Sequence, residues 1–335
     1  MTTIPPGDRT GSVVSRHGRC DALLEWSVVG SFGSIGYRLR SPDWERIPGD
    51  ALADRVVVIT GATSGIGRAV ATGAARLGAR LRFVARDPDK ASDLERLLRE
   101  QSPHGDISFY LADLSVMSQV SAVSQQILDT EPRIDVLINN VGVLPQQRIE
   151  TPEGLELAYA TDLLGPFLLT NRLRKRMVDS APARIISVVS GGMYTQGLEL
   201  EDPNYAQGDY HGSVAYARAK RGMMVLTKIW ADQLAGTGVT ANAVHPGWVD
   251  TPGVRNSLPM FHRIARPLLR TPEQGADTVL WLATSPVGVE ATGKLWHDRA
   301  VRAEYRLKST VETPADRDRL WAKLTETADQ LAGGR

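Results

Sequence analysis

A tyrosine and a lysine four residues apart are the first pair in this sequence that could perform acid–base chemistry. Tyr216 and Lys220 lie in the run Tyr-Ala-Arg-Ala-Lys, and on a helix two residues at this spacing share one face. A nearby ammonium favours the phenolate and lowers the tyrosine pKa from its ordinary value of about 10. Such a tyrosine could donate a proton in a reduction and accept one in an oxidation. This spacing is common and usually structural, so other motifs must decide.

A glycine-rich turn offers a second kind of chemistry, the binding of a dinucleotide phosphate. It runs Gly61-Ala62-Thr63-Ser64-Gly65-Ile66-Gly67 and joins the apolar run 56–59 to an expected helix. Its glycines let the backbone turn tightly and approach a pyrophosphate, and the helix N-terminus presents free N–H groups. The spacing differs from the Gly-x-Gly-x-x-Gly fingerprint, so it is the position after a first buried strand that indicates a dinucleotide site.

The residues after the second expected strand bear on which dinucleotide binds. An acidic side chain there accepts from the 2′-hydroxyl of NAD, whereas an arginine accommodates the 2′-phosphate of NADP. The strand 81–84 is followed by Ala85, Arg86 and Asp87, and a guanidinium matches a phosphate bidentately. We therefore expect NADP(H). The alternative is that Arg86 is a solvated surface residue and that Asp87 selects NAD(H).

The elements that must position these residues have the pattern of an α/β fold. Apolar runs without polar alternation, typical of a parallel sheet covered on both faces, occur at 56–59, 81–84, 107–111, 136–138, 185–189 and 240–244, with a weak seventh at 294–297. Amphipathic stretches predict helices between them, as at 66–77 and 89–100. We expect a single Rossmann-like, doubly wound parallel sheet of about seven strands within residues 51–335, with a C-terminal helix from Thr313-Pro314 and an N-terminal extension at 1–50.

On these motifs the sequence resembles the short-chain dehydrogenase/reductase family over residues 54–300. The motifs, in family order, are the turn 60–67, Asp113-Leu114, Asn139-Asn140-Val141-Gly142, Ser190, Tyr216 with Lys220, and Pro246-Gly247-Trp248-Val249-Asp250-Thr251. Independent motifs in one order argue against a chance match. The runs 190–193, 245–255 and 274–278 resemble, more narrowly, the group called dehydrogenase/reductase SDR family member 12.

The resemblance implies a role for each residue. Ser190 would hold and polarise a substrate carbonyl, Tyr216 would donate its proton, and Lys220 would bind the nicotinamide ribose while tuning Tyr216. The cofactor would also contact Gly61, Thr63, Ser64, Gly65, Ile66, Gly67, Arg86, Asp113, Leu114, Asn140, Gly142, Pro246, Gly247, Val249 and Thr251. Two hydroxyls that converge on one oxygen, opposite a hydride donor, suit the stabilisation of a developing alkoxide.

One position departs from the family pattern. Asp162 stands in Asp-Leu-Leu-Gly-Pro-Phe where the resemblance implies a catalytic asparagine. An aspartate could accept from the same water but lacks the amide donor. Its charge near Lys220 is expected to weaken the lowering of the Tyr216 pKa, and Pro166 is expected to disturb the helix.

Two segments could cover the substrate. Ser190 lies 26 residues before Tyr216, about twice the separation usual in the family. The extra segment, 191–213, is expected to form a loop over the substrate side. The segment 252–272 forms either a second lid suited to an apolar substrate or an ordinary packed helix, and its apolar side chains are Leu258, Met260, Phe261, Ile264, Leu268 and Leu269.

The N-terminal extension has two parts. Residues 1–20 have no apolar core of a secretory signal and are expected to be disordered. Residues 21–40 place on one helical face the apolar side chains Leu23, Leu24, Trp26, Val28, Val29, Phe32, Ile35 and Leu39. We favour a helix packed on the domain or at a dimer contact. The alternative is a membrane-surface anchor that ends in Arg38 and Arg40, although the glycines weaken any long helix.

Composition argues against several other classes of protein. The net charge is +1, without the basic stripe of a nucleic-acid-binding protein. Cys20 is the one cysteine, and the six histidines lack metal-ligand spacing, so we expect no metal and a structural role for His245. No run reaches the ~18 apolar residues of a membrane span. These features fit a cytoplasmic protein.

Together the observations predict an NADP(H)-dependent oxidoreductase, either a carbonyl reductase or an alcohol dehydrogenase. Its substrate would be a small or lipid-like apolar carbonyl or alcohol. The alternative is a catalytically weak NADP(H)-binding protein that acts as a regulatory or scaffold module, which the Asp162 departure favours. We also expect a homo-oligomer, formed through helices at 153–178 and 214–235.

Overall fold

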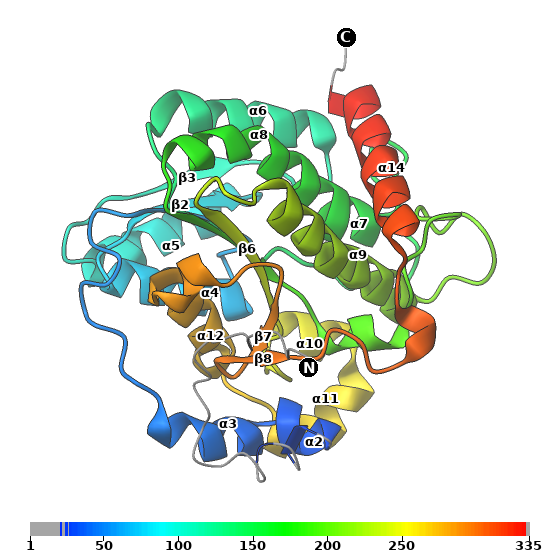
Figure 1. Ribbon diagram of the computed structural model, residues 1–335, viewed down its shortest axis with the longest axis horizontal. Helices are drawn as coiled ribbons and strands as arrows, with labels where there is room; N and C mark the ends of the chain where they lie inside the picture. The colour runs from blue at the N-terminus through cyan, green and yellow to red at the C-terminus, as the bar shows by residue number, and fades with distance from the viewer. Residues whose placement is uncertain (1–20, 22–23, 26, 333–335) are drawn as a thin grey trace, which may run out of the picture.

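The computed structural model, which describes residues 21, 24–25 and 27–332, contains one eight-stranded sheet between two layers of helices (Figure 1). The strand order is β3-β2-β1-β4-β5-β6-β7-β8, and every pairing is parallel except that of β7 with β8. This is the predicted doubly wound α/β fold. The strands are β1 (Val56–Thr60), β2 (Arg80–Ala85), β3 (Ile107–Leu111), β4 (Val136–Asn139), β5 (Ala183–Val188), β6 (Val239–Val244), β7 (Leu295–His297) and β8 (Ala300–Arg302).

The longer helices cover both faces of the sheet. One layer consists of α4 (Gly65–Arg76), α5 (Pro88–Gln101) and α12 (Pro272–Thr284), and the other of α6 (Met117–Thr130), α8 (Gly165–Asp179), α9 (Gly212–Gln233) and α14 (Pro314–Ala332) (Figure 1). Side chains of β1 alternate between the layers, because Val57 and Ile59 pack with the first and Val58 with the second. Both faces of β1 are therefore buried, which explains its uninterrupted apolar sequence.

Shorter elements connect these layers around the ends of the strands. They are α2 (Val28–Phe32), α3 (Ser34–Arg40), η1 (Ser41–Asp43), α7 (Leu157–Tyr159), η2 (Ala160–Leu164), η3 (Gly191–Thr195), α10 (Pro252–Ser257), α11 (Pro259–Ala265), η4 (Arg266–Leu268), α13 (Val287–Glu290) and η5 (Lys308–Thr310). Of these, η2 is one turn of π-helix that continues directly from α7 and into α8.

The sequence predicts about seven strands, and β8 is the one that it does not show. This strand pairs with β7 across a two-residue turn formed by Asp298 and Arg299, whose φ angles are 53° and 54°. Positive φ at both central residues is typical of a tight hairpin turn, which Asn-Gly or Asp-Gly usually forms. An arginine in the second position removes that signal from the sequence.

The segment 21–40 differs in shape from the single apolar helix that its pattern suggests. Among its described residues, the part from 28 to 40 forms two short helices, α2 and α3, which meet at Gly33. A Cβ atom on Gly36 would lie 2.3 Å from the carbonyl oxygen of Gly30, so only glycine lets α3 fold this closely onto α2. Phe32 is buried, whereas the aliphatic side chains of Val28, Val29, Ile35 and Leu39 are exposed. Leu23, Trp26 and the predicted disorder of residues 1–20 lie outside the described residues.

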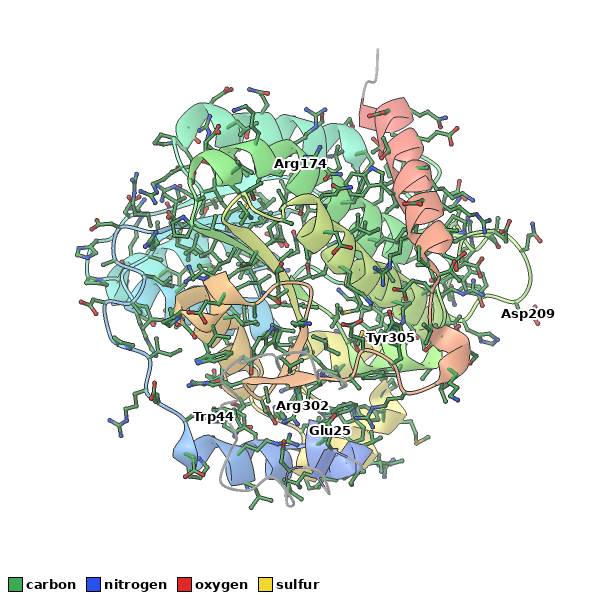
Figure 2. The ribbon with its side chains drawn as sticks, in the orientation of Figure 1. Glu25, Trp44, Arg174, Asp209, Arg302 and Tyr305 are labelled. Atoms are coloured by element: carbon green, nitrogen blue, oxygen red, sulfur yellow. The ribbon has the colours of Figure 1, made fainter. Side chains whose placement is uncertain are left out.

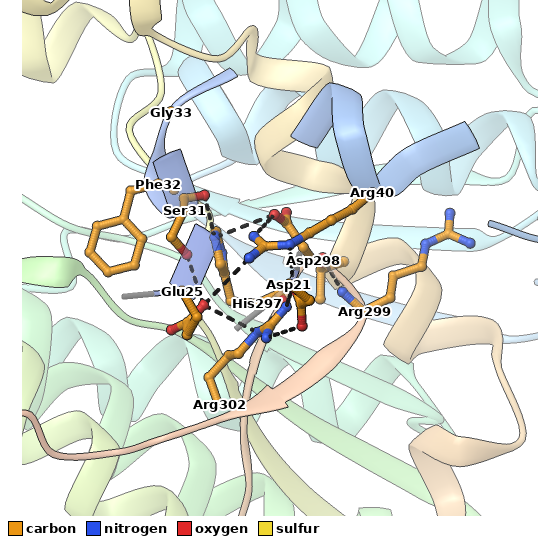
Figure 3. Close-up of polar contacts among 12 residues, drawn as sticks. Asp21, Glu25, Ser31, Phe32, Gly33, Arg40, His297, Asp298, Arg299 and Arg302 are labelled. Atoms are coloured by element: carbon orange, nitrogen blue, oxygen red, sulfur yellow. Dashed lines mark hydrogen bonds and ion pairs between the residues drawn. The ribbon is translucent and has the colours of Figure 1, made fainter. Parts of the chain in front are cut away.

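Charged side chains attach this segment to the last strands of the sheet (Figure 3). The Arg40 guanidinium donates to Asp21 and to Asp298, each over 2.7 Å. Arg302, on β8, donates to the same Asp21 carboxylate over 2.7 and 3.1 Å. The segment therefore packs on the domain, as the favoured prediction states, but through its backbone and charged groups and not through its aliphatic side chains.

Candidate active site

A cleft of about 1430 Å³ opens at the carboxyl ends of the parallel strands. Loops that follow β1, β2, β3, β4, β5 and β6 line it, which is where open α/β sheets bind ligands. Every residue predicted to contact the cofactor lines this cleft, and so does Ser190. Asp162 is the one predicted site residue outside the lining, because it is fully buried behind Lys220.

The glycine turn forms one wall of the cleft and has no room for side chains. Gly61 has a φ of +69° and Gly65 one of +52°, conformations that glycine adopts without strain. A Cβ atom on Gly67 would lie 2.1 Å from the carbonyl oxygen of Gly61 and 2.4 Å from Nδ2 of Asn140. The turn leads into the N-terminus of α4, whose free N–H groups suit a phosphate. This wall therefore fits the pyrophosphate of a dinucleotide.

Asn140 holds the glycine turn in this shape. Its side-chain Nδ2 donates to the carbonyl oxygens of Thr60 over 3.0 Å and Gly61 over 3.1 Å. The Thr60 hydroxyl in turn accepts from the backbone N–H groups of Asn140 and Val141. Sequence reasoning places Asn140 beside the adenosine but misses Thr60, whose bracing role depends on the pairing of β1 with β4.

The two residues that could select the cofactor differ in what they contact. Asp87 caps α5: one carboxylate oxygen accepts from the backbone N–H of Lys90 and the other lies 3.0 Å from the Lys90 ammonium. These contacts lower the pKa of Asp87. Arg86 is exposed at the rim of the cleft and has no hydrogen bond or ion pair with any residue that the structure describes. Of the two, Arg86 is the side chain that is available to a ligand.

Tyr216, Lys220 and Ser190 meet at the other end of the cleft. Helix α9 presents Tyr216 and Lys220 on one face, with the Lys220 Nζ 5.5 Å from the centre of the tyrosine ring. Burial is the largest effect on the pKa of Tyr216 and raises it above its ordinary value, against the lowering effects of the Lys220 ammonium and the Ser190 hydroxyl, so the predicted net lowering is not present in this structure. Ser190 follows β5 and caps the N-terminus of η3, where its hydroxyl accepts from the backbone N–H of Gly192. The three side chains thus converge although they come from two elements.

Asp162 lies directly behind this group. One of its carboxylate oxygens accepts from the backbone N–H of Val143 over 2.8 Å, and the other lies 3.4 Å from the Lys220 Nζ. Burial raises the pKa of Asp162 to about 6, against the lowering effects of Lys220 and the Val143 N–H. The carboxylate in turn raises the pKa of Tyr216. The predicted opposition between Asp162 and Lys220 is therefore present in the geometry.

The helix is disturbed next to Pro166, as predicted. Asp162 lies in the π-helical turn η2, and Pro166 is the second residue of α8. Proline has no N–H to donate to the preceding turn, and a widened turn inside a helix is often found at functional sites. Gly165 meets the loop after β3 here, because a Cβ atom on it would lie 2.2 Å from the carbonyl oxygen of Leu114.

The segment 191–213 does not cover the cleft, and that prediction is wrong. No lining residue of the cleft comes from it among the described residues, and Figure 2 shows Asp209 at the outer edge of the molecule. Its tyrosines find partners elsewhere: the Tyr210 hydroxyl donates to Glu156 over 2.8 Å, and the Arg218 guanidinium lies over the Tyr205 ring. These contacts draw the loop toward α7 and α9.

The second candidate lid, 252–272, borders the cleft at one end only. It folds into α10, α11 and η4, and Gly253 and Val254 of α10 line the cleft. Met260 and Ile264 of α11 point to solvent, with exposed fractions of 71% and 73%. The segment is thus neither an ordinary packed helix nor a complete cover.

Arg270 lies behind the loop 245–251 and supports the cleft, and sequence reasoning missed it, whereas the structural role of His245 was predicted. A Cβ atom on Gly247, whose φ is +83°, would lie 2.5 Å from Nε of the buried Arg270. His245 is buried, and its Nδ1 accepts from the backbone N–H of Gly247. Burial lowers the pKa of His245 well below its ordinary value, so the residue is neutral and structural. Half of the hydrogen bonds of the Arg270 guanidinium are to the backbone carbonyl oxygens of residues 31–33, which are distant in sequence and leave no sequence signal.

Known proteins share both the sequence and the fold of this chain. A family model described as short chain dehydrogenase matches residues 55–260. Dehydrogenase/reductase SDR family member 12 of Bos taurus is 36% identical over 314 residues, which are 92% of this chain and 96% of that protein. Retinol dehydrogenase 14 of Mus musculus is 37% identical over 261 residues, which cover 73% of this chain and 78% of the relative. The solved complex of Pseudomonas aeruginosa RhlG with NADP has a TM-score of 0.61 at 25% identity, covering 75% of this chain and 96% of that one.

Proposed function

This chain belongs to the short-chain dehydrogenase/reductase family of NAD(P)-dependent oxidoreductases, and we propose that it uses NADP(H) to interconvert a carbonyl and an alcohol on an apolar or lipid-like substrate. The observation that carries the proposal is the meeting of Ser190, Tyr216 and Lys220 in the cleft that the glycine turn also lines. A protein that only bound a dinucleotide would need the turn, but not a phenol and a hydroxyl beside a buried ammonium.

In this proposal the side chains move the proton and stabilise charge. When bound, the cofactor supplies the hydride in reduction and accepts it in oxidation. In reduction, the Ser190 hydroxyl donates a hydrogen bond to the substrate carbonyl oxygen and the Tyr216 hydroxyl donates its proton to the same oxygen. The Lys220 ammonium stabilises the phenolate that remains. In oxidation, the Tyr216 phenolate removes the proton from the alcohol.

Asp162 is a positioning residue in this proposal. Its second carboxylate oxygen is buried and has no hydrogen-bond partner among the described residues. This oxygen faces Lys220, whose Nζ also donates to the Val141 carbonyl over 3.1 Å. The carboxylate fixes the ammonium through its charge and, at the same time, opposes the stabilisation of the Tyr216 phenolate.

The preference for NADP(H) rests on Arg86. Its guanidinium is free at the rim of the cleft, whereas the Asp87 carboxylate already caps α5. A free arginine suits a 2′-phosphate, and an occupied aspartate is a poor acceptor for a 2′-hydroxyl. The solved RhlG complex contains NADP, which agrees with this proposal for our chain.

The substrate class follows from the apolar part of the cleft. Val143, Leu144, Val189 and Val254 are among its lining residues, and apolar side chains favour an apolar ligand. The mouse relative is a retinol dehydrogenase, and retinol is an apolar alcohol. We therefore propose apolar carbonyls and alcohols as the first compounds to screen.

The experiment that tests the proposed function compares Tyr216→Phe with the wild type and with Tyr110→Phe as a control. Tyr110 is a half-buried tyrosine outside the cleft, whose hydroxyl contacts Thr130. We expect Tyr216→Phe to turn over an apolar carbonyl at least about a hundredfold more slowly than the wild type and to keep its rise in Tm with NADPH. We expect Tyr110→Phe to keep both the turnover and the rise in Tm. Turnover retained by Tyr216→Phe would sink the proposed mechanism.

The scaffold alternative has one observation in its favour, the Asp162 carboxylate beside Lys220. It predicts a rise in Tm with NADPH but no turnover by the wild type over the whole carbonyl and alcohol screen. Turnover above the Tyr216→Phe level with any apolar substrate would exclude it.

A further inference from the structure

Two neighbouring helices expose aliphatic side chains in the same pattern. In α3, Ile35 and Leu39 stand four residues apart and are 44% and 58% exposed; in α11, Met260 and Ile264 have the same spacing and are more exposed still. Residues four apart on a helix share one face. Each pair therefore forms an outward-facing aliphatic stripe.

The two stripes belong to one side of the molecule. A Cβ atom on Gly33, which directly precedes α3, would lie 3.2 Å from the carbonyl oxygen of Leu268. Leu268 ends η4, which follows α11 directly. Figure 1 shows α2, α3 and α11 together along the lower edge of the molecule. We call this surface the aliphatic–arginine face: Val28, Val29, Ile35, Arg38, Leu39, Met260, Arg263, Ile264 and Arg266.

The charge on the aliphatic–arginine face has one sign. Arg38 and Arg263 flank the two stripes, and Arg266 follows α11; all three are exposed. None of them has a hydrogen bond or ion pair from its side chain to any residue that the structure describes. The ranges 27–42 and 251–272 contain no aspartate or glutamate. The face thus joins exposed aliphatic groups to three free cations with no carboxylate between them.

We propose that the aliphatic–arginine face binds the surface of a bilayer that contains anionic lipid. Aliphatic side chains would enter the boundary between headgroups and acyl chains, while the arginines reach the phosphates. No helix in the described part of the chain has the length and apolar character to cross a bilayer. The proposed contact is therefore one made along the membrane surface.

The composition of the face favours a lipid surface over a protein partner. Protein interfaces are rich in tyrosine and tryptophan anchors and have complementary charges, whereas the large exposed side chains on this face are aliphatic and its charges are all positive. A second copy of the chain would also place arginines against arginines in a symmetric contact. An anionic lipid surface matches both properties.

The position of the face suggests that membrane contact gives an apolar substrate access to the cleft, an inference that rests on the proposed function. Helix α10, whose Gly253 and Val254 line the cleft, leads through Leu258 into α11. The mouth of the cleft is thus joined to the aliphatic–arginine face by one short segment. An apolar substrate dissolved in the bilayer would reach the cleft without crossing water.

The experiment measures binding of the full-length protein to vesicles, which requires neither cofactor nor turnover. Vesicles of phosphatidylcholine alone are compared with vesicles that also contain phosphatidylglycerol, in low and high salt. We expect binding to the anionic vesicles that weakens in high salt. Leu39→Glu with Ile264→Glu should weaken it by at least about tenfold. Arg38→Ala with Arg263→Ala and Arg266→Ala should weaken it about fivefold per arginine.

Val311→Glu is the matched control, because Val311 is 52% exposed and lies outside the face, just before α14. It should bind as the wild type does. The variants must have a Tm close to that of the wild type in the absence of cofactor, which shows that they are folded, and their mass is measured by light scattering. No binding by the wild type, or equal binding by all variants, overturns the proposal. A wild-type dimer that the glutamate variants dissociate would instead make the face a subunit contact and also overturns it.

Discussion

The Nζ atom of Lys220, which lines the cleft, lies 3.4 Å from a carboxylate oxygen of Asp162, and both side chains are buried. The carboxylate therefore holds the ammonium that the Tyr216 phenolate needs, and it also repels that phenolate. The first effect orders the site, and the second raises the pKa of the proposed acid–base residue.

Replacing this carboxylate by an amide should increase the fraction of Tyr216 that is a phenolate at neutral pH. Asp162→Asn removes a charge that raises the pKa of Tyr216, so both limbs of the pH–rate profile should move to lower pH. Alcohol oxidation at pH 7 should then rise by roughly threefold or more, since one pKa unit is a factor of ten. The measurement is kcat against pH in both directions.

The control for this profile is Asp179→Asn, which also removes an aspartate beside a lysine but does so on the exposed end of α8. There the Asp179 carboxylate lies 2.8 Å from the Lys175 Nζ and is exposed to solvent. Neither residue lines the cleft. Its profile should match that of the wild type. An Asp162→Asn profile that overlays both would show that the carboxylate does not act on Tyr216.

The same substitution should change how stability depends on pH. Burial raises the pKa of Asp162 from 3.8 to about 6 in the folded protein. Below pH ~4 the carboxyl is protonated in both the folded and unfolded states, and above its folded pKa the folded state carries the cost of a buried charge. Stability that this group contributes at low pH is therefore lost as the pH rises through about 6. The shift in pKa corresponds to a loss on the order of 3 kcal/mol in the free energy of unfolding.

Urea denaturation of the wild type and Asp162→Asn between pH 4 and pH 7 measures this effect, because asparagine does not titrate. The free energy of unfolding of the wild type, relative to the variant, should fall as the pH rises. A difference that stays constant over this range would mean that Asp162 ionises as an ordinary carboxyl.

Arg86→Ala tests the choice of cofactor. Loss of a charge-assisted, bidentate contact to the 2′-phosphate should raise the Kd for NADPH by about tenfold to a hundredfold and leave the Kd for NADH unchanged. Isothermal titration with each cofactor measures both. Arg96→Ala, on the solvent side of α5, is the control and should change neither. Equal losses for NADPH and NADH would refute the role given to Arg86.

The pattern of apolar runs is sufficient to predict the seven parallel strands but not β8, because strands covered on both faces are mostly apolar. Asp113, Asn140 and Thr251 could likewise be assigned to one site, since each follows a strand and the carboxyl ends of parallel strands share one edge. The loop 191–213 could not be placed in this way. Its position depends on Tyr210 finding Glu156, a contact between loops that no periodicity encodes.

The N-terminal segment shows the same limit. Its aliphatic pattern predicts one buried helical face, but Phe32 is the large apolar side chain of α2 and α3 that the structure buries. The segment is held instead by Arg270, which donates to the backbone carbonyl oxygens of Ser31, Phe32 and Gly33 over 2.7–3.1 Å. Every residue has a backbone carbonyl oxygen, so this attachment could not be predicted from residue types.

Arg270 should accordingly matter for both stability and the cleft. The same guanidinium donates to both carboxylate oxygens of Asp298, over 2.5 and 2.9 Å, and is almost wholly buried. Removing one partner of a buried ion pair costs about 3–5 kcal/mol. We expect Arg270→Ala to lower the free energy of unfolding by that amount and to make the segment 27–40 sensitive to limited proteolysis.

The backbone around Arg270 extends this effect to the cofactor. Its N–H donates to the Trp248 carbonyl and its carbonyl accepts from the Asp250 N–H, so it pairs with the loop whose Gly247 and Val249 line the cleft. Arg270→Ala should therefore also raise the Kd for NADPH. Arg255→Ala removes an exposed ion pair with Asp250 and should cost under about 1 kcal/mol. If Arg270→Ala costs no more than this control, the N-terminal segment is not held through Arg270.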